Sequence, residues 1–152
     1  MPDYLETTID KFTFRVATDR VYSPEGIWLL LDATPGPPRV RVGVTDFVQQ
    51  HNGDMAFANV KPQRTSLAAG DPFAELETMK VTFELASPIA GTVAEINQSL
   101  EFTPELINQD PYDRGWLALI ETTDWDVART KLLDPAGYLK LMQSQAEEEL
   151  KS

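Results

Sequence analysis

The chain has 152 residues, no cysteine, a single histidine and a formal net charge of −11, and 42% of its residues are hydrophobic. This length and hydrophobic content are typical of one domain with a real core. The acidic balance argues against nucleic acid, whose phosphates are contacted by Lys and Arg, and against an anionic membrane surface. Without cysteine there is no disulfide, thiol nucleophile or cysteine metal site, and His51 alone cannot build a histidine metal cluster.

The first residues of the chain are acidic and lack the apolar segment of a signal peptide. The longest apolar run, Ile27 to Leu31, is far too short to span a bilayer. We therefore expect a cytoplasmic, monomeric protein.

The first half of the chain is expected to be rich in strands. Apolar residues alternate or run together in four segments, 12–16, 27–31, 39–44 and 55–60. Pro35 to Pro38 has no helical or sheet option and predicts a loop. Thr45 is a candidate N-cap for a short helix that Asn52-Gly53 stops.

The segment around Lys80 shows a change of phase. Strand sequence runs from Phe73 to Met79 and again from Val81 to Leu85. Apolar residues occupy even positions before the lysine and odd positions after it, whereas one continuous strand keeps them on one parity. We therefore expect Lys80 at the tip of a β-hairpin, although no Gly, Asn or Pro marks the turn.

The remainder predicts two more strands and a helical C-terminal end. Ser87 to Ile96 is typical of a turn and a strand, and Gly115 leads into a strand over 116–120. Thr103 is a candidate N-cap with Pro104 as the first helical residue. Helical spacing then links Trp125, Ala128 and Leu132, and a second helix is expected after Asp134-Pro135, with Leu139, Met142, Ala146 and Leu150 on one face. About seven short strands with helices at the end predict an α+β, mainly β, fold with a sandwich or barrel-like core.

The chain offers little for catalysis. His51 lies at an expected helix end, where a cation is favourable, and is interpreted as a helix-end residue. Glu75 and Glu77 share a strand face and could do acid–base work, but exposed strand carboxylates usually solvate an edge. The three tryptophans, Trp28, Trp116 and Trp125, are expected in the core.

Lys80 is the most informative residue. It is the only Lys or Arg between Thr65 and Asp113, a stretch with nine Asp or Glu residues. A hairpin-tip amine can form an amide with a carboxylic-acid cofactor, which would give imported chemistry to a chain that lacks its own. The alternative is an ordinary solvated lysine.

Several motifs resemble those of glycine cleavage system H-proteins, in family order over roughly residues 40–121. They are Val42-Gly43-Val44-Thr45-Asp46-Phe47 with Gly53-Asp54-Met55-Ala56-Phe57, the segment from Gly70 to Lys80, Ser87-Pro88-Ile89-Ala90-Gly91-Thr92-Val93, and Thr103 to Tyr112 followed by Gly115-Trp116-Leu117. The last is similar to the family's "NPELVN-x-DPY-x-x-GW" signature and is the most specific.

The resemblance implies a lipoyl-type flattened β-barrel, or barrel-sandwich hybrid, with short helices and a C-terminal helical segment. It implies a single lipoyl-carrier domain over 1–152, with a core at about 12–121 and helices at about 124–150. Lys80 would be the lipoyl attachment site, and Glu77 would belong to the modification motif three residues before it. The protein would then be a carrier rather than an enzyme, modified by a lipoate-attaching enzyme and reoxidised by dihydrolipoyl dehydrogenase.

Departures from the family pattern affect the expected pathway. The lysine is flanked by Met79 and Val81, and no histidine precedes Trp28. With the longer N-terminus and acidic C-terminus, these features resemble H-protein-like lipoate-binding proteins that serve heterodisulfide-reductase-like complexes in bacterial sulfur oxidation. The alternative is a glycine cleavage H-protein that works with glycine decarboxylase and aminomethyltransferase.

Two further alternatives stay open. Met79-Lys80 supplies half of the Met-Lys-Met motif of biotin carriers, but Val81 breaks it and biotin domains lack the DPY…GW segment. A binding module with an unmodified lysine is the other.

Overall fold

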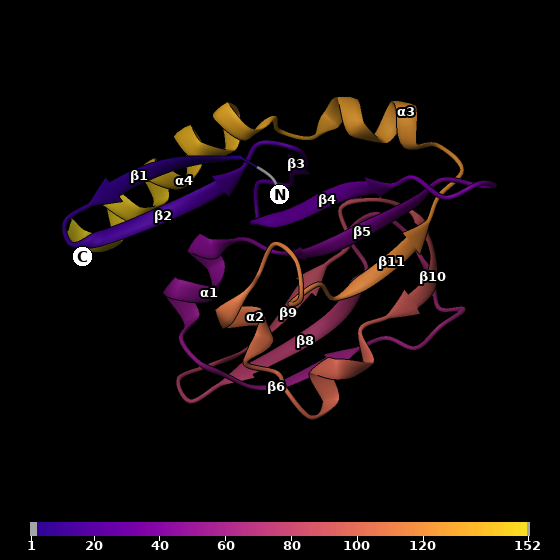
Figure 1. The fold of residues 1–152 in the computed structure, drawn as a ribbon, viewed down its shortest axis with the longest axis horizontal. Helices are drawn as coiled ribbons and strands as arrows, with labels where there is room; N and C mark the ends of the chain where they lie inside the picture. Colours follow the sequence, from indigo (N-terminus) through magenta and orange to yellow (C-terminus); the bar gives the residue numbers. More distant parts are fainter. Residues whose placement is uncertain (1–2, 152) are drawn as a thin grey trace.

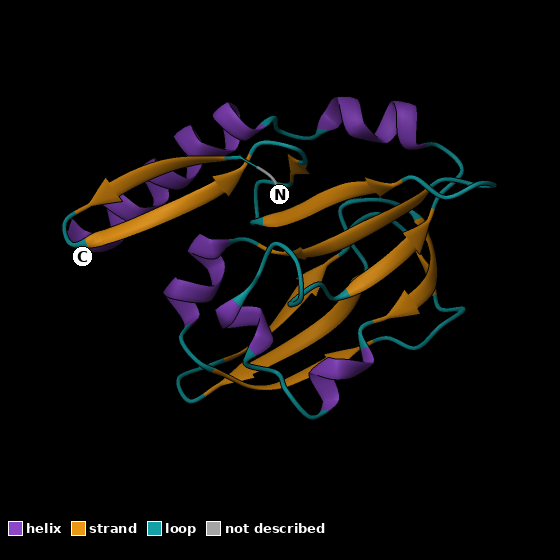
Figure 2. Ribbon diagram, viewed as in Figure 1, coloured by secondary structure: helices purple, strands orange, loops and turns teal. Residues whose placement is uncertain are grey.

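The structure, a computed structural model, describes residues 3–151, with Lys151 placed in its helix without a described side chain. It is mainly β, with strands in three open sheets and helices between and after them (Figures 1 and 2). The largest sheet has six strands in the order β3 (Val21–Tyr22), β4 (Ile27–Asp32), β5 (Arg39–Val44), β11 (Ala118–Glu121), β10 (Gly91–Ile96) and β7 (Ser66–Leu67).

The second sheet carries the lysine hairpin, and the third lies at the N-terminus. The second is antiparallel, in the order β6 (Met55–Val60), β8 (Pro72–Thr78) and β9 (Thr82–Ala86). The third is the hairpin of β1 (Tyr4–Ile9) and β2 (Phe12–Ala17), which packs on the C-terminal helix. The six-stranded and three-stranded sheets enclose one apolar cluster, which is the barrel-sandwich arrangement expected of the fold.

Six helical segments complete the described chain. They are α1 (Asp46–Asn52), η1 (Gln98–Glu101), α2 (Leu106–Gln109), α3 (Trp125–Ala128), η2 (Arg129–Lys131) and α4 (Pro135–Lys151). None of the helices in the described residues is long and apolar enough to cross a membrane.

Two apolar clusters hold the elements together. The larger lies between the six-stranded and three-stranded sheets and includes Val42, Phe73 and Ile120. The second lies beneath α4 and the β1–β2 hairpin, where Trp28 and Tyr138 are fully buried. Side chains alternate between the two faces of each strand, and those that face inward fill the clusters.

Most expected strands are confirmed, and three boundaries were wrong. The helix expected to start at Pro104, with Thr103 as its N-cap, begins instead at Leu106, with Glu105 at the N-cap position. The strand expected from Trp116 begins at Ala118. The helix expected from Trp125 to Leu132 ends at Ala128 and tightens into η2. Leu132 is extended there, because Leu133 exchanges two backbone hydrogen bonds with Tyr22 of β3.

The core predictions for tryptophan hold with one exception. Trp28 and Trp125 are buried, whereas Trp116 is only partly buried. The Arg41 guanidinium lies over the Trp116 ring, 4.5 Å from its centroid.

Candidate functional site

Lys80 lies at the tip of the β8–β9 hairpin. Glu77 pairs with Thr82, and the Thr78 N–H donates to the Val81 carbonyl at 2.8 Å. Only Met79 and Lys80 lie between these two residues, and both are exposed. The hairpin inferred from the parity change is therefore confirmed.

The Thr78 hydroxyl stabilises the turn, which contains no Gly, Asn or Pro. Its oxygen accepts hydrogen bonds from the backbone N–H of Lys80 and of Val81, each at 3.2 Å, and lies 3.3 Å from the Val81 carbonyl. A threonine side chain thus satisfies donors that a turn leaves free, as Ser and Thr do in side-chain-to-backbone turns. Because Thr78 is buried, this anchor fixes the tip while the lysine stays in solvent.

The Lys80 side chain reaches the C-terminal end of α1. Its Nζ donates to the His51 carbonyl at 3.3 Å. Carbonyls in the last turn of a helix lack intrahelical partners and carry partial negative charge, so they attract an ammonium group. Nζ forms no ion pair with any carboxylate in residues 3–151, so acylation of this amine would break no salt bridge.

The end of α1 is held in place by a residue from the distant signature segment. Asn108 Nδ2 donates to the Gly53 carbonyl at 2.9 Å, and its Oδ1 accepts from the Met55 N–H at 2.9 Å. Gly53, at φ 89°, ends the helix in a conformation that favours glycine. At the other end Thr45 caps α1 through its hydroxyl, as expected. Asn108 therefore fixes the helix terminus that faces the lysine.

The rest of the signature segment is also structural. The Tyr112 hydroxyl donates to the Arg15 carbonyl at 2.6 Å, and the Trp28 Nε1 donates to the Pro111 carbonyl at 2.9 Å. At Gly115 a Cβ atom would lie 2.6 Å from the Leu106 carbonyl, so no larger residue fits. These contacts join the segment after α2 to β2 and β4, and they explain the motif by packing rather than by catalysis.

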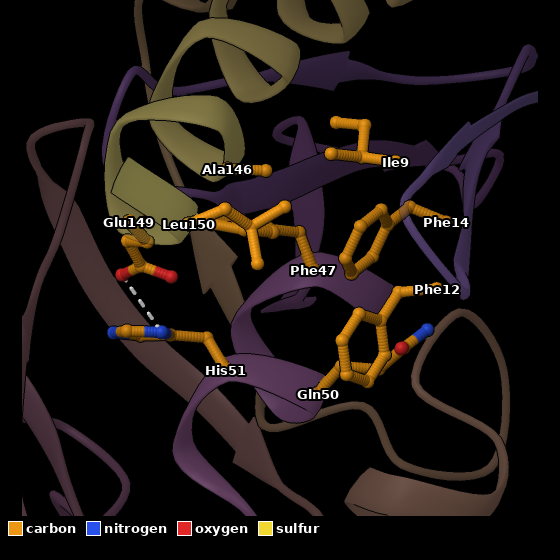
Figure 3. A pocket seen from close by; sticks show the side chains of 9 residues that line it. All are labelled: Ile9, Phe12, Phe14, Phe47, Gln50, His51, Ala146, Glu149 and Leu150. Atoms are coloured by element: carbon orange, nitrogen blue, oxygen red, sulfur yellow. Dashed lines mark ion pairs between the residues drawn. The ribbon is translucent and has the colours of Figure 1, made fainter. Parts of the chain in front are cut away.

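An apolar groove of about 270 Å³ begins at His51 (Figure 3). It lies between the β1–β2 hairpin, the last two turns of α1 and the end of α4. Its lining residues are Ile9, Phe12, Phe14, Phe47, Gln50, His51, Ala146, Glu149 and Leu150. The backbone carbonyl of His51 contacts Lys80 while the side chain of the same residue lines the groove, so a flexible apolar group on Lys80 could reach it.

His51 itself is a helix-end residue, as expected. It lies in the last turn of α1, its ring stacks on Phe47, and its Nδ1 lies 2.8 Å from Glu149 Oε1. The contact ties α1 to α4 across the groove (Figure 3).

The two carboxylates singled out by the sequence do not form an acid–base pair. Glu77 and Glu75 share the outer face of β8, where Glu77 is half-buried and accepts from the Thr82 hydroxyl at 3.3 Å. Glu75 pairs across the sheet with Glu84 and is exposed. Glu77 lies near the tip but bonds to β9 rather than to Lys80. Within residues 3–151 no cluster of His, Asp or Glu could hold a metal ion.

Sequence reasoning missed three contributors to the site. Thr78 was expected only as strand, the His51 carbonyl was not considered, and β1 was not assigned. The carbonyl and the groove join segments that lie far apart in the chain, so local patterns carry no signal for them. Thr78 could have been found, because a threonine two residues before an unmarked turn tip is a recognised turn residue.

The sequence of this chain is similar to those of known proteins. Residues 22–145 match the family described as "Glycine cleavage H-protein". The sequence is 33% identical to a glycine cleavage system H protein of Carboxydothermus hydrogenoformans, over 87% of this chain and 98% of the relative. It is 38% identical to one of Mycobacterium tuberculosis, over 81% and 93% respectively.

The fold agrees. The crystal structure of a glycine cleavage system H protein from Mycobacterium marinum superposes with a TM-score of 0.71 at 29% identity, covering 81% of this chain and 95% of that one. The matched segment leaves out the β1–β2 hairpin and the last turn of α4, which supply most of the groove lining. This chain belongs to the glycine cleavage H-protein family.

Proposed function

We propose that this protein, folding as one domain, is a lipoyl carrier of the glycine cleavage type, with Lys80 as the attachment site. One observation carries the proposal. Lys80 is an exposed primary amine on a two-residue hairpin tip, and it lies inside the segment matched by the H-protein family.

The residues around Lys80 fit a lipoyl group. Among residues 3–151 the ammonium donates to the His51 carbonyl alone, and an amide formed at Nζ keeps an N–H that can donate to the same oxygen. When attached, lipoate supplies a disulfide ring that can take up a substrate-derived group or two electrons. The cysteine-free chain has no thiol of its own that could exchange with such a ring.

The chain's own residues position the lipoyl-lysine arm, which is the Lys80 side chain together with the lipoyl group attached to it. Thr78 fixes the tip, so the attachment point stays in place while the side chain moves. The groove beside His51 offers apolar surface to the hydrocarbon part of the arm. Glu77, in the modification motif, braces β8 to β9 through Thr82 and so acts on the tip indirectly.

The glycine cleavage pathway has better support than sulfur oxidation. The relatives that cover most of this chain carry the name glycine cleavage system H protein, and the sulfur-oxidation branch has no support among them. Met79 and Val81 beside the lysine are not enough to outweigh this. The expected partners are therefore a lipoate-attaching enzyme, glycine decarboxylase, aminomethyltransferase and dihydrolipoyl dehydrogenase.

The first test is the site of modification. The purified chain is incubated with a lipoate–protein ligase, lipoic acid and ATP, and its intact mass and peptides are measured. We expect one lipoyl adduct, located on Lys80, and none on Lys80→Arg, because a guanidinium offers no acylatable amine. Lys61→Arg is the matched control, since Lys61 is also exposed and should be dispensable. A biotin adduct in cells, or an adduct retained by Lys80→Arg, would contradict the proposal.

A further inference from the structure

The outer face of the β6–β8–β9 sheet leads directly to Lys80. The register sets Phe57, Glu77 and Thr82 side by side in one row across the three strands. The next row away from the tip consists of Asn59, Glu75 and Glu84. We call the acceptor face these two rows together with the tip residue Met79.

Large apolar side chains gather on this face without cover. Phe57 is 66% exposed and Met79 is 92% exposed. Single exposed apolar residues are ordinary on a protein surface, but a group of them beside one functional residue indicates an interaction site. Phe57 is one residue row from the turn, and Met79 directly precedes the lysine.

The same face is acidic. Glu75, Glu77 and Glu84 lie on it, and Lys80 is the only Lys or Arg from Thr65 to Asp113. Docking on this face is therefore favoured when the partner has an apolar recess surrounded by Lys or Arg side chains.

We infer that the acceptor face is the docking surface for the enzyme that acylates Lys80, and that this enzyme presents an apolar recess for Phe57 and Met79 bordered by basic residues. The inference rests on the proposed function and names the partner chemistry that the site requires.

The acylation chemistry selects this enzyme over the later ones. The acyl carbon of an acyl adenylate must reach Nζ itself: the C–N bond forms, the bond from the acyl carbon to the phosphate oxygen breaks, AMP leaves with the electron pair, and the amine loses its proton to solvent. The attaching enzyme must therefore cover the hairpin tip. Enzymes that act on the distal ring can reach it at the end of the arm.

The experiment uses the full, unmodified chain as substrate for a bacterial lipoate–protein ligase with lipoic acid and ATP. The variant is Phe57→Thr, which keeps a strand-forming residue. The control is Val127→Thr, which removes another exposed apolar residue, 51% exposed, from α3. In Figure 1, α3 lies on the far side of the molecule from β6. We expect Phe57→Thr to raise KM about tenfold, the usual scale for an interface anchor, with kcat within about twofold. The control should leave both constants unchanged.

A charge test is independent of the apolar one. Reversing Glu75 and Glu84 to lysine should raise KM and remove most of its dependence on salt, because the attraction to a basic rim is lost. Glu25→Lys, at an exposed acidic residue before β4, is its control. Thermal melting and circular dichroism confirm that each variant is folded.

The outcomes separate the two proposals. Wild-type KM for folded Phe57→Thr, or a change confined to kcat, would overturn the docking surface while leaving Lys80 as the acceptor. A wild-type chain that acquires no lipoate on Lys80 would overturn the proposed function itself.

Discussion

At the scale of single residues, Thr78 determines how the lysine is presented. A tight hairpin turn usually requires glycine or asparagine, whose backbone tolerates the left-handed region. Here neither Met79 nor Lys80 has positive φ, and the Thr78 hydroxyl accepts hydrogen bonds from the N–H groups of Lys80 and Val81. This arrangement leaves the tip free for two long side chains.

Replacing the hydroxyl should loosen the tip. Thr78→Val keeps the shape but leaves the Lys80 and Val81 N–H groups without this acceptor, so we expect the free energy of unfolding to fall by about 1 kcal/mol. Thr78→Ser, which keeps the hydroxyl, should stay within about 0.5 kcal/mol of the wild type. Urea unfolding measures both. Equal stability of the two variants would show that the hydroxyl does not hold the turn.

The residue scale also shows how far sequence reasoning goes. The lone amine and the parity change of its flanking strands placed Lys80 on a hairpin tip, because strand periodicity is a local signal. The acceptor of its Nζ was not predictable. His51 lies 29 residues before Lys80, and Asn108, which fixes the end of that helix, lies 55 residues after the Gly53 carbonyl that it binds. Such contacts follow from the packing of elements and not from their own sequences.

At the scale of elements, α4 is joined to the core by buried tyrosines. Tyr138 stacks on Tyr22 with ring centroids 4.7 Å apart, and its hydroxyl lies 2.8 Å from that of Thr45, the cap of α1. Burial raises the pKa of Tyr138 to about 12, offset in part by the Thr45 hydrogen bond. Burial also raises the pKa of Tyr22 and of Tyr112.

These tyrosines should make the fold sensitive to alkali. In the unfolded chain a tyrosine ionises near pH 10, whereas folded Tyr138 keeps its proton to about pH 12. The folded state then binds more protons than the unfolded state, so stability is full below pH 10 and falls as the pH rises through this window. From pH 8 to pH 11 we expect Tyr138 alone to account for a loss of roughly 1.4 kcal/mol.

Urea unfolding at the two pH values tests this. Tyr138→Phe loses its hydrogen bond to Thr45 at both, so the difference between pH 8 and pH 11 isolates the ionisation. We expect that difference to be smaller in Tyr138→Phe than in the wild type. Tyr4→Phe, at a partly exposed ring, is the control and should leave the difference unchanged. An identical pH dependence in Tyr138→Phe would exclude Tyr138 as a source of the alkaline sensitivity.

Element boundaries show why prediction stops short of the structure. Strands with clear alternation, such as β5 and β6, were found with their correct limits. The helix after Trp125 was expected to continue to Leu132 because the apolar spacing continues. The backbone instead turns extended there, since β3 offers Leu133 two hydrogen bonds that a helix would forgo. The sequence carries the spacing but not the position of β3.

At the scale of the whole molecule, the segment that matches the family is flanked by further elements, and the chain carries a strong negative charge. The β1–β2 hairpin precedes the matched segment and packs on α4, so the chain closes the groove near Lys80 with parts of its own. The net charge of −11 creates a field that attracts basic partner surfaces over roughly a Debye length, about 8 Å at physiological salt. Partner choice should therefore depend on the acceptor face and on ionic strength.

The choice between glycine cleavage and sulfur oxidation depends on the whole surface of the molecule. An assay with glycine decarboxylase tests this choice directly. The lipoylated chain is offered to the decarboxylase with glycine, and carbon dioxide release is compared with that supported by the Mycobacterium tuberculosis relative. That relative is 38% identical over 93% of its length, so we expect rates within about tenfold, which corresponds to 1.4 kcal/mol in docking. The rate should fall as salt is added, because screening weakens attraction to the acidic chain.

Lys80→Arg, treated in the same way, should support no release. Negligible release, together with efficient use of the lipoylated chain by a heterodisulfide-reductase-like complex, would move the protein to sulfur oxidation and show that Met79 and Val81 control partner choice.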